Sequence, residues 1–533
     1  MVVFELVIAL LFAGAMLAAW GRRFSLPYPA LLALAGAGLA LLPGVPDVTL
    51  DPELALALFV APVLLDAAFD SSPRDLKENW RVVTSLALIA VGLTVAAVAL
   101  VVKWLVPALP WPAAITLGAI VAPPDAAAAT TVLRQLKAPH RIFVILEGES
   151  LFNDATALLI YRLAVGAAMT GAFSGWSALP ALALATAGSI VLALIWVRLI
   201  RMTIGRIEDV ATSVITQFVG TFVLWIVAER LRLSGIITVV VFAITIARTA
   251  PDTMPARLRI PSYAVWEVAV FVLNVLAFIL VGLQLGPILE RLDRVRFVTY
   301  ASVAATVFVA VVLVRIVWVM GYSSAGQWFR NLRPLTGPPQ RYPSYREGVV
   351  IAWCGMRGLV TIAAALALPH GPPASAFPYR DLILFTAFCV VVGTLVIQGL
   401  TVTPLMRALR LQSDDSVAQE VRRARAETAR AGLAAIRHRD ADETDEMSRL
   451  LVRKYEARLG HAEADEVAGG EVEDEALSAY GRAVERAQAA ERRTLLDLRT
   501  RGVIGDDAFH RVEEELDWAE VSARSHQNQQ AQG

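Results

Sequence analysis

A cluster of oxygen-bearing side chains interrupts an apolar stretch at residues 149–154, which read Glu-Ser-Leu-Phe-Asn-Asp. On a helix, Asp154 follows Ser150 by four residues and Asn153 follows it by three, so a hydroxyl, an amide oxygen and a carboxylate share one face. Hard oxygen ligands of this kind suit a small cation, or a proton in its place. The spacing therefore predicts a cation- or proton-binding site. The alternative is a polar seam between helices, but such seams usually use Ser, Thr or Asn rather than an acid.

The surrounding stretch, from about residue 142 to about residue 170, is long enough to cross a bilayer as a helix. Carboxylates at membrane depth are costly, so they usually serve a function. Asp66, Asp125 and Arg357 lie in three further apolar segments, and all four charges are about 11 to 14 residues from a segment end. At about 1.5 Å per residue they are roughly 16–21 Å deep. That depth is near the midplane of a core about 30 Å thick, which predicts a shared polar centre.

Two of these segments contain residues that break a helix. Pro123 and Pro124 directly precede Asp125, and residues 355–358 read Gly-Met-Arg-Gly. Consecutive prolines cannot lie inside a continuous helix, and paired glycines weaken one. Unwound backbone at membrane depth is tolerated only where it lines a cavity or is buried in protein. Matched interruptions in corresponding segments of two repeats point to the binding site of a secondary transporter.

The elements that must position these residues are apolar segments. The chain has 533 residues, of which 56% are hydrophobic, and a mean hydropathy of +0.58, values typical of a polytopic membrane protein. We predict an all-α fold with about thirteen transmembrane helices in two inverted repeats, of which the fifth and twelfth are broken. The predicted segments are roughly 2–20, 27–43, 52–70, 82–106, 112–133, 142–169, 178–200, 210–229, 235–250, 262–289, 298–322, 347–369 and 381–409.

Charge divides the chain and orients it. Residues 1–411 carry 30 Lys and Arg against 21 Asp and Glu, whereas residues 412–533 carry 18 against 27. Loops that follow odd-numbered segments are the more basic ones, so the positive-inside rule places the N-terminus outside and the tail in the cytoplasm. We predict a transmembrane domain over 1–411 and a charged helical tail over 412–533, for which a regulatory module, a dimer contact and a solvated appendage all remain open.

At this point the chain resembles a known family, the cation:proton antiporter-1 family of NhaP/NHE-type sodium–proton exchangers. The resemblance covers about residues 1–411 and rests mainly on residues 146–155 and on Gly-Met-Arg-Gly at 355–358. Weaker matches are residues 62–67 and the run from Trp266 to Leu283. The combination of Glu-Ser-x-x-Asn-Asp with Gly-x-Arg-Gly is specific, whereas either motif alone is moderate evidence.

The resemblance implies a role for each matched residue. Asp154 resembles the carboxylate that binds cation and proton alternately, Asn153 the first half of the Asn-Asp pair of electroneutral exchangers, and Ser150 a cation ligand. It also implies three further roles, which are a structural ion pair of Glu149 with Arg357, an acid at the helix crossing for Asp125, and an acid beside the cytoplasmic approach for Asp66.

The resemblance further implies a plasma-membrane homodimer that exchanges Na⁺, or K⁺ or Li⁺, for H⁺, with the lipid bilayer as its surroundings and without cofactor or nucleic acid. One departure concerns ion choice. Many members carry Thr-Asp-Pro at the fifth-segment break, whereas this chain has Pro124-Asp125-Ala126, so one hydroxyl ligand is missing.

The exchange mechanism can be argued from physical chemistry. Desolvation disfavours the charged form of a buried carboxylate, so protons can compete with cations for it near neutral pH. If Asp154 must hold one or the other before the site crosses, exchange is obligatory. A cation channel or a K⁺-selective exchanger with the same polar centre is the rival hypothesis, although a channel needs a continuous pore. A hydrolytic enzyme is disfavoured, because the only histidines of residues 1–411 are His140 and His370, both in loops.

Overall fold

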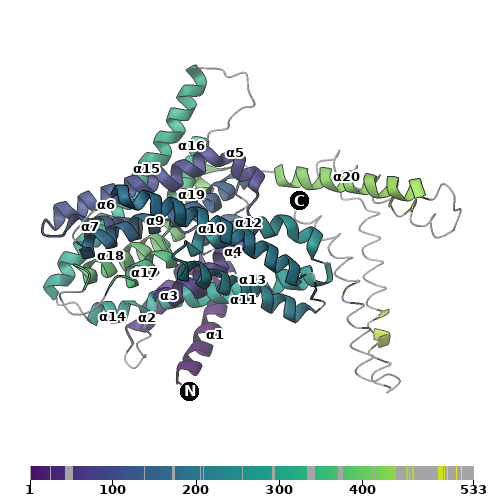
Figure 1. The fold of residues 1–533 in the computed structure, drawn as a ribbon, viewed down its shortest axis with the longest axis horizontal. Helices are drawn as coiled ribbons and strands as arrows, with labels where there is room; N and C mark the ends of the chain where they lie inside the picture. Colours follow the sequence, from purple (N-terminus) through teal and green to yellow (C-terminus); the bar gives the residue numbers. More distant parts are fainter. Residues whose placement is uncertain are drawn as a thin grey trace. The chain divides into compact units, whose positions relative to one another are not determined.

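The computed structural model consists of helices, and no strand is present among the residues it describes (Figure 1). Those residues are 2–411, except for 24–25, 43–51, 137, 171–174, 205, 208, 255, 291–293, 333–342 and 370–375, followed by 416–439 and short stretches between 452 and 518. The chain divides into two compact units, Met1–Gln412 and Ser413–Gly533. The predicted domain boundary at residue 411 lies one residue from this division.

The first unit contains the membrane helices. Its first half comprises α1 (Val2–Arg23), α2 (Tyr28–Ala40), α3 (Pro52–Ala55), α4 (Ala61–Asp70), α5 (Pro73–Thr84), α6 (Val91–Leu105), α7 (Trp111–Val121), α8 (Ala126–Gln135), α9 (His140–Thr170) and α10 (Gly175–Ile204). The second half comprises α11 (Val210–Arg230), α12 (Gly235–Thr253), α13 (Ala256–Leu283), α14 (Leu285–Glu290), α15 (Arg294–Leu332), α16 (Tyr345–Trp353), α17 (Leu359–Leu366), α18 (Arg380–Gly393) and α19 (Gly399–Leu409).

Some of these helices continue into one another through short π-helical turns. The turns connect α3 with α4, α5 with α6, and α18 with α19, and they span Leu56–Val60, Ser85–Ala90 and Thr394–Gln398. Within the described residues, eight helical spans are long and apolar enough to cross a membrane, and three shorter apolar helices accompany them. One of these spans, Trp111–Gln135, comprises both α7 and α8. The all-helical polytopic fold is thereby confirmed, whereas thirteen crossings and the inverted repeat stay predictions.

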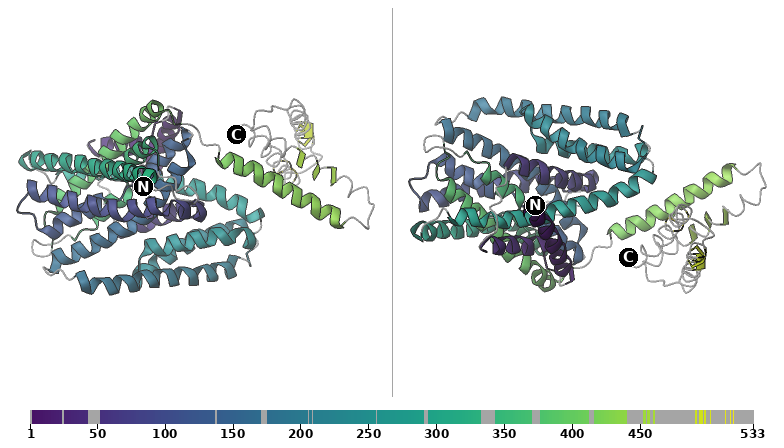
Figure 2. Two further views of the ribbon diagram at one scale, coloured as in Figure 1. Left: turned by 90° about the horizontal axis from the view of Figure 1, so that it is seen from above. Right: turned by 90° about the horizontal axis from the view of Figure 1, so that it is seen from below.

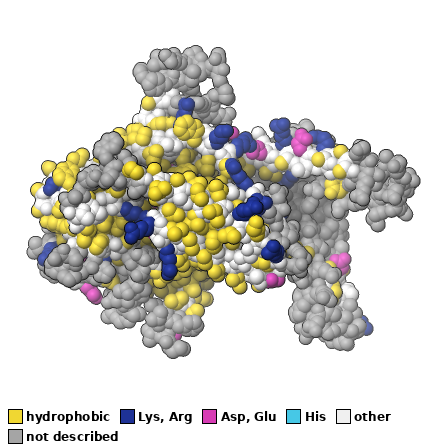
Figure 3. Space-filling model, in the orientation of Figure 1, with side chains coloured by type: hydrophobic (Ala, Val, Ile, Leu, Met, Phe, Trp, Pro, Cys, Tyr) yellow, Lys and Arg dark blue, Asp and Glu magenta, His cyan; other side chains and the backbone are white. Residues whose placement is uncertain are grey.

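The surface of the first unit agrees with a membrane location. Figure 3 shows a broad hydrophobic area with few charged side chains over this face of the unit. Helices α10, α11 and α12 pack against one another, and the views in Figure 2 show them side by side along one edge of the unit. Exposed apolar side chains on this scale are rare on soluble monomers, and they indicate contact with lipid or protein.

Helices α2 and α13 pack closely against each other. A methyl group on Gly36 would overlap the backbone carbonyl of Ile279, and one on Gly282 would overlap the carbonyl of Ala33. Small residues let helix backbones approach closely in membranes, where packing rather than hydrophobic burial drives association. The two glycines therefore fix the distance between α2 and α13.

In the second unit the structure describes one long helix, α20 (Ser416–Arg439). Its Ala-, Arg- and Glu-rich sequence agrees with the helical composition predicted for the tail. Most of the tail beyond Arg439 lies outside the described residues.

Candidate functional site

The two predicted helix breaks are present, and they touch each other. Helix α7 ends at Val121 and α8 begins at Ala126, whereas α16 ends at Trp353 and α17 begins at Leu359. The backbone N–H of Asp125 donates to the carbonyl of Met356 at 2.7 Å, so the two unwound stretches hydrogen-bond directly. Prolines force the first break because they cannot donate to the preceding turn. This contact between the two unwound stretches, called the crossing below, gives hydrogen-bond partners to backbone groups that would otherwise have none at membrane depth.

The carboxylate of Asp125 lies at the start of two half-helices. Its Oδ1 accepts from the backbone N–H of Ala127 at 2.9 Å, which caps the N-terminus of α8. Gly358 is the N-cap of α17 and has no side chain to cap with. A methyl group on Gly358 would overlap Oδ2 of Asp125, so this oxygen occupies the place of the missing cap side chain. Helix N-termini favour negative charge, and this carboxylate caps α8 and lies beside the N-terminus of α17.

Arg357 donates hydrogen bonds to carbonyl groups near the C-terminal ends of the neighbouring half-helices. Its Nε donates to the carbonyl of Val121, the last residue of α7, at 2.7 Å, and its Nη1 donates to the carbonyl of Gly355. Its backbone N–H donates to Oγ1 of Thr394 at 2.9 Å. Helix C-termini favour cations, and the guanidinium, whose residue is 1% exposed, is held by carbonyl groups.

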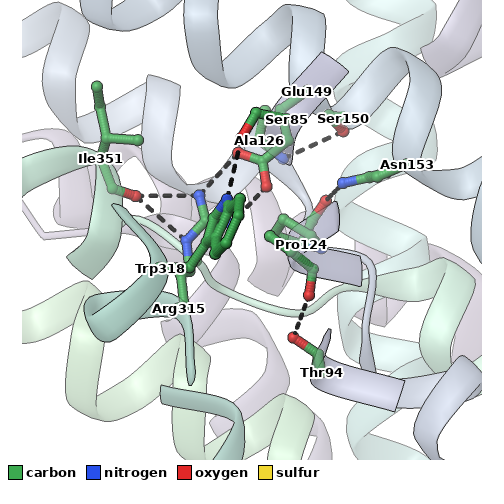
Figure 4. Close-up of polar contacts among 12 residues, drawn as sticks. Ser85, Thr94, Pro124, Ala126, Glu149, Ser150, Asn153, Arg315, Trp318 and Ile351 are labelled. Atoms are coloured by element: carbon green, nitrogen blue, oxygen red, sulfur yellow. Dashed lines mark hydrogen bonds and ion pairs between the residues drawn. The ribbon is translucent and has the colours of Figure 1, made fainter. Parts of the chain in front are cut away.

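The predicted ion pair of Glu149 with Arg357 is wrong, because the partner of Glu149 is Arg315 (Figure 4). The guanidinium of Arg315 in α15 contacts both carboxylate oxygens, with Nη1–Oε1 at 2.5 Å and Nη2–Oε2 at 2.8 Å. Nη2 also donates to the carbonyl of Ile351 at 3.0 Å, near the end of α16. Both residues are at most 4% exposed, so the two buried charges neutralise each other.

Sequence reasoning missed Arg315 although a signal was present. Arg315 is the only charged residue of the predicted segment 298–322, and a lone charge in such a segment calls for a partner. The sequence does not specify which of two buried arginines faces Glu149. That choice depends on the crossing, where Arg357 is held by the ends of the broken helices.

Helix α9 contributes the cluster from which the site was predicted. Asn153 is buried, and its Nδ2 donates to the carbonyl of Pro124 at 3.0 Å. The hydroxyl of Ser150 accepts from the backbone N–H of Ala126 at 3.4 Å. Figure 4 shows both contacts between α9 and the break before α8. Asp154 is 6% exposed and, among the described residues, has no hydrogen-bond or ion-pair partner.

A large cavity, with a volume of about 1220 Å³, reaches the crossing. Its wall includes four of the predicted site residues, Asp66, Asp125, Ser150 and Asp154. Asn153, Glu149 and Arg357 are not among the lining residues, so the structure gives them positioning contacts instead. Further residues with polar side chains on the wall are Tyr28, Asp70, Thr130, Thr131, Arg134, Gln135, Glu147, Arg201, Gln217, Thr221, Ser262, Tyr263, Trp266, Glu267, Asn274 and Thr361.

This arrangement can bind a small cation or a proton. Carboxylate and hydroxyl oxygens converge on one hollow space, and they are the hard ligands that alkali cations prefer. Glu149, Arg315 and Arg357 are satisfied within the protein, and Asp125 lies at two helix starts. Asp154 is therefore the deep carboxylate whose charge has no local partner among the described residues.

Comparison with known proteins agrees with this chemistry. A family model described as the transmembrane part of sodium/hydrogen exchangers matches residues 7–408. The chain is 30% identical to an uncharacterized Na⁺/H⁺ exchanger of Mycobacterium tuberculosis, over 94% of this chain and 92% of that protein. It is 29% identical to a sodium, potassium, lithium and rubidium/H⁺ antiporter of Bacillus pumilus, over 81% of this chain and 66% of that protein.

The fold is also similar to a solved structure. The sodium proton antiporter of Methanocaldococcus jannaschii superposes with a TM-score of 0.59 at 19% identity, covering 74% of this chain and 98% of that one. A membrane-embedded carboxylate site at crossed, broken helices and a family match over most of the membrane unit lead to the same conclusion. The chain belongs to the sodium/hydrogen exchanger family and is a cation/proton antiporter, not an enzyme.

Proposed function

We propose that Asp154 is the group that holds a cation and a proton in turn. The observation that carries this assignment is its isolation. The other charged groups at the crossing, which are Asp125, Glu149, Arg315 and Arg357, are matched by an ion pair, by carbonyl groups or by helix N-termini. Asp154 lines the cavity and has no such partner among the described residues. Desolvation disfavours its bare carboxylate, so an occupant of charge +1 stabilises it. One cation replaces one proton, which makes the exchange electroneutral.

The neighbouring residues divide the remaining work. Ser150 and Asp125 line the cavity and supply oxygens toward the cation, while Asn153 holds the carbonyl of Pro124 and so fixes the break. Asp66 lies on the same wall and attracts cations toward the site. Alternating access follows if the broken helices move together as one body relative to the rest of the unit. Asp154 without a bound cation or proton then does not cross the apolar barrier, because moving an uncompensated negative charge through it is costly.

The orientation of the cavity supports an inward-facing state. Its wall includes Asp70, Arg134, Arg201 and Met254, which lie beside the basic loops of the sequence. The positive-inside rule places these loops in the cytoplasm, with the N-terminus outside and the tail inside. We further propose a plasma-membrane location and a homodimer. Accessibility of single introduced cysteines in intact cells tests the orientation, and the mass in detergent tests the dimer.

The transported cation is Na⁺, with K⁺ and Li⁺ as further candidates. Relatives of similar identity are named both as Na⁺/H⁺ exchangers and as sodium, potassium, lithium and rubidium/H⁺ antiporters. Dissipation of a pH gradient in proteoliposomes by each chloride salt in turn ranks the three ions. A channel would pass cations without counterflow of protons, so the same vesicles test that alternative.

The decisive variant is Asp154→Asn, which keeps the size of the side chain and removes its charge. We expect it to fold in detergent and to lose cation-driven proton flux. Asp209→Asn is the matched control, because Asp209 caps α11 outside the cavity and asparagine also caps helices well. Flux retained in folded Asp154→Asn protein would refute the assignment.

A further inference from the structure

We propose that the hydroxyl group of Thr361 is an additional cation ligand and influences which cation is preferred. This inference rests on the proposed role of Asp154. Thr361 lies in the first turn of α17 and is among the residues that line the cavity. The sequence motifs did not single it out, since it lies three residues beyond Gly358 in an apolar run.

The position of Thr361 relative to Asp125 follows from helix geometry. With Gly358 as N-cap of α17, Thr361 is the third helical residue, and side chains at these two positions are neighbours in a capping box. Residues three apart on a helix have Cβ atoms about 5–6 Å apart. Oδ2 of Asp125 occupies the place of the missing Gly358 side chain. Thr361 therefore lies in the helix turn that begins beside the carboxylate of Asp125.

The hydroxyl of Thr361 has no hydrogen-bond partner among the described residues, although the residue is only 1% exposed. Buried hydroxyl groups on helices usually donate to the carbonyl four residues earlier, as Thr130 does to Ala126 at 3.0 Å. For Thr361 that carbonyl belongs to Arg357, which lies in the unwound stretch before the helix. The local partner is thus out of place, and the oxygen is left for a ligand.

A second buried threonine shows that an unpartnered hydroxyl alone does not define the site. Thr386 in α18 is 0% exposed and its Oγ1 also has no partner among the described residues. Thr386 is not among the residues that line the cavity. It therefore serves as a matched control, because it shares burial and lack of a partner but not access to the cation.

The chemistry of a hydroxyl ligand predicts which property changes. A neutral oxygen replaces one water of a dehydrated cation without altering the charge balance at Asp154. Small cations hold their water more strongly than large ones, so a preformed oxygen favours Na⁺ and Li⁺ over K⁺. The hydroxyl should affect cation affinity and preference, and leave the maximal rate largely unchanged.

The test compares Thr361→Val, which removes the hydroxyl at similar size, with Thr361→Ser, which keeps it. We expect Thr361→Val to raise the half-saturation concentrations for Na⁺ and Li⁺ by about three- to tenfold, in line with the loss of one neutral polar contact. The change for K⁺ should be smaller. Thr361→Ser and Thr386→Val should match the wild type, and the shift should recur in Na⁺-dependent thermal stabilisation in detergent.

Unchanged half-saturation for Na⁺ in folded Thr361→Val protein, or an equal shift in Thr386→Val, would overturn the proposal. If Thr361→Val does not fold, Thr361→Ala removes the hydroxyl with less bulk and is judged by the same criteria. Asp154→Asn separates this proposal from the one on which it rests. Proton flux that survives in Asp154→Asn would refute the assignment of Asp154 as the binding carboxylate. If Asp154→Asn loses flux but Thr361→Val keeps the wild-type half-saturation for Na⁺, only the proposed role of Thr361 as a ligand is refuted.

Discussion

At the scale of single residues, the buried charges of the crossing are neutralised in three different ways. Glu149 and Arg315 form a two-oxygen ion pair, Arg357 is bound by carbonyl groups, and Asp125 lies at helix N-termini. Each solution avoids a stranded charge at membrane depth. The pair of Glu149 with Arg315 also joins α9 to α15.

We expect Arg315→Ala to destabilise the protein strongly. Removal of one partner of a buried pair strands the other charge and costs about 3–5 kcal/mol. Replacement of both partners, in Arg315→Ala with Glu149→Ala, should recover part of the loss. Recovery should be incomplete, because Arg315 also donates to the carbonyl of Ile351. Thermal unfolding in detergent measures the effect, and Glu149→Ala with Arg357→Ala is the control pair that should show no recovery.

At the scale of elements, the half-helices depend on backbone contacts that leave no room for side chains. The carboxylate of Asp125 occupies the space that a side chain of Gly358 would take, and the guanidinium of Arg315 lies in the corresponding space at Gly355. A Cβ atom at either position would overlap the incoming group. Gly355 and Gly358 thus weaken the helix and also leave space for the charged side chains of neighbouring helices.

Gly358→Ala should impair exchange by about tenfold or more, because displacement of Asp125 by even 1 Å alters the site geometry. The added methyl group would overlap its Oδ2. Gly166→Ala in α9 is the control, since a Cβ atom there meets nothing within 4 Å. Proton flux per folded molecule is the measurement. Equal flux in the two variants would show that Asp125 can leave Gly358 without harm to transport.

Gly282→Ala should destabilise the packing of α2 against α13 by about 1–3 kcal/mol, because overpacking a tight contact forces backbone shifts. The methyl group would overlap the carbonyl of Ala33. Gly321→Ala in α15 has open space around it and should not be destabilised. Comparison of the two unfolding temperatures tests whether this helix contact contributes to stability.

At the scale of the whole molecule, all residues assigned to the site lie in the first of the two units. The division falls between Gln412 and Ser413, and the family match ends at residue 408. A chain truncated after Gln412 should therefore fold and exchange cations for protons in proteoliposomes. A monodisperse truncated protein without flux would show that the tail is needed for transport itself. A changed pH profile with intact maximal flux would identify the tail as regulatory.

The membrane class, the two broken segments and three of the six carboxylates that line the cavity could be predicted from the amino-acid sequence alone. These features are local, because apolar length, consecutive prolines and the spacing of Ser150, Asn153 and Asp154 act within one segment. The cost of a charge in an apolar helix also requires no knowledge of its neighbours. For this reason Asp66, Asp125 and Asp154 could be selected before the fold was known, and all three line the cavity.

Which of these groups contact one another depends on the tertiary structure. The sequence offers two buried arginines for Glu149, and the crossing assigns Arg357 to helix ends and leaves Arg315 as the ion-pair partner. Likewise, Asn153 shares a helix face with Asp154 but turns its amide to the carbonyl of Pro124. The hydroxyl of Thr361 becomes a candidate ligand only because α17 begins beside Asp125. Pairing depends on the distances between helices, and those are set by packing between segments far apart in the chain.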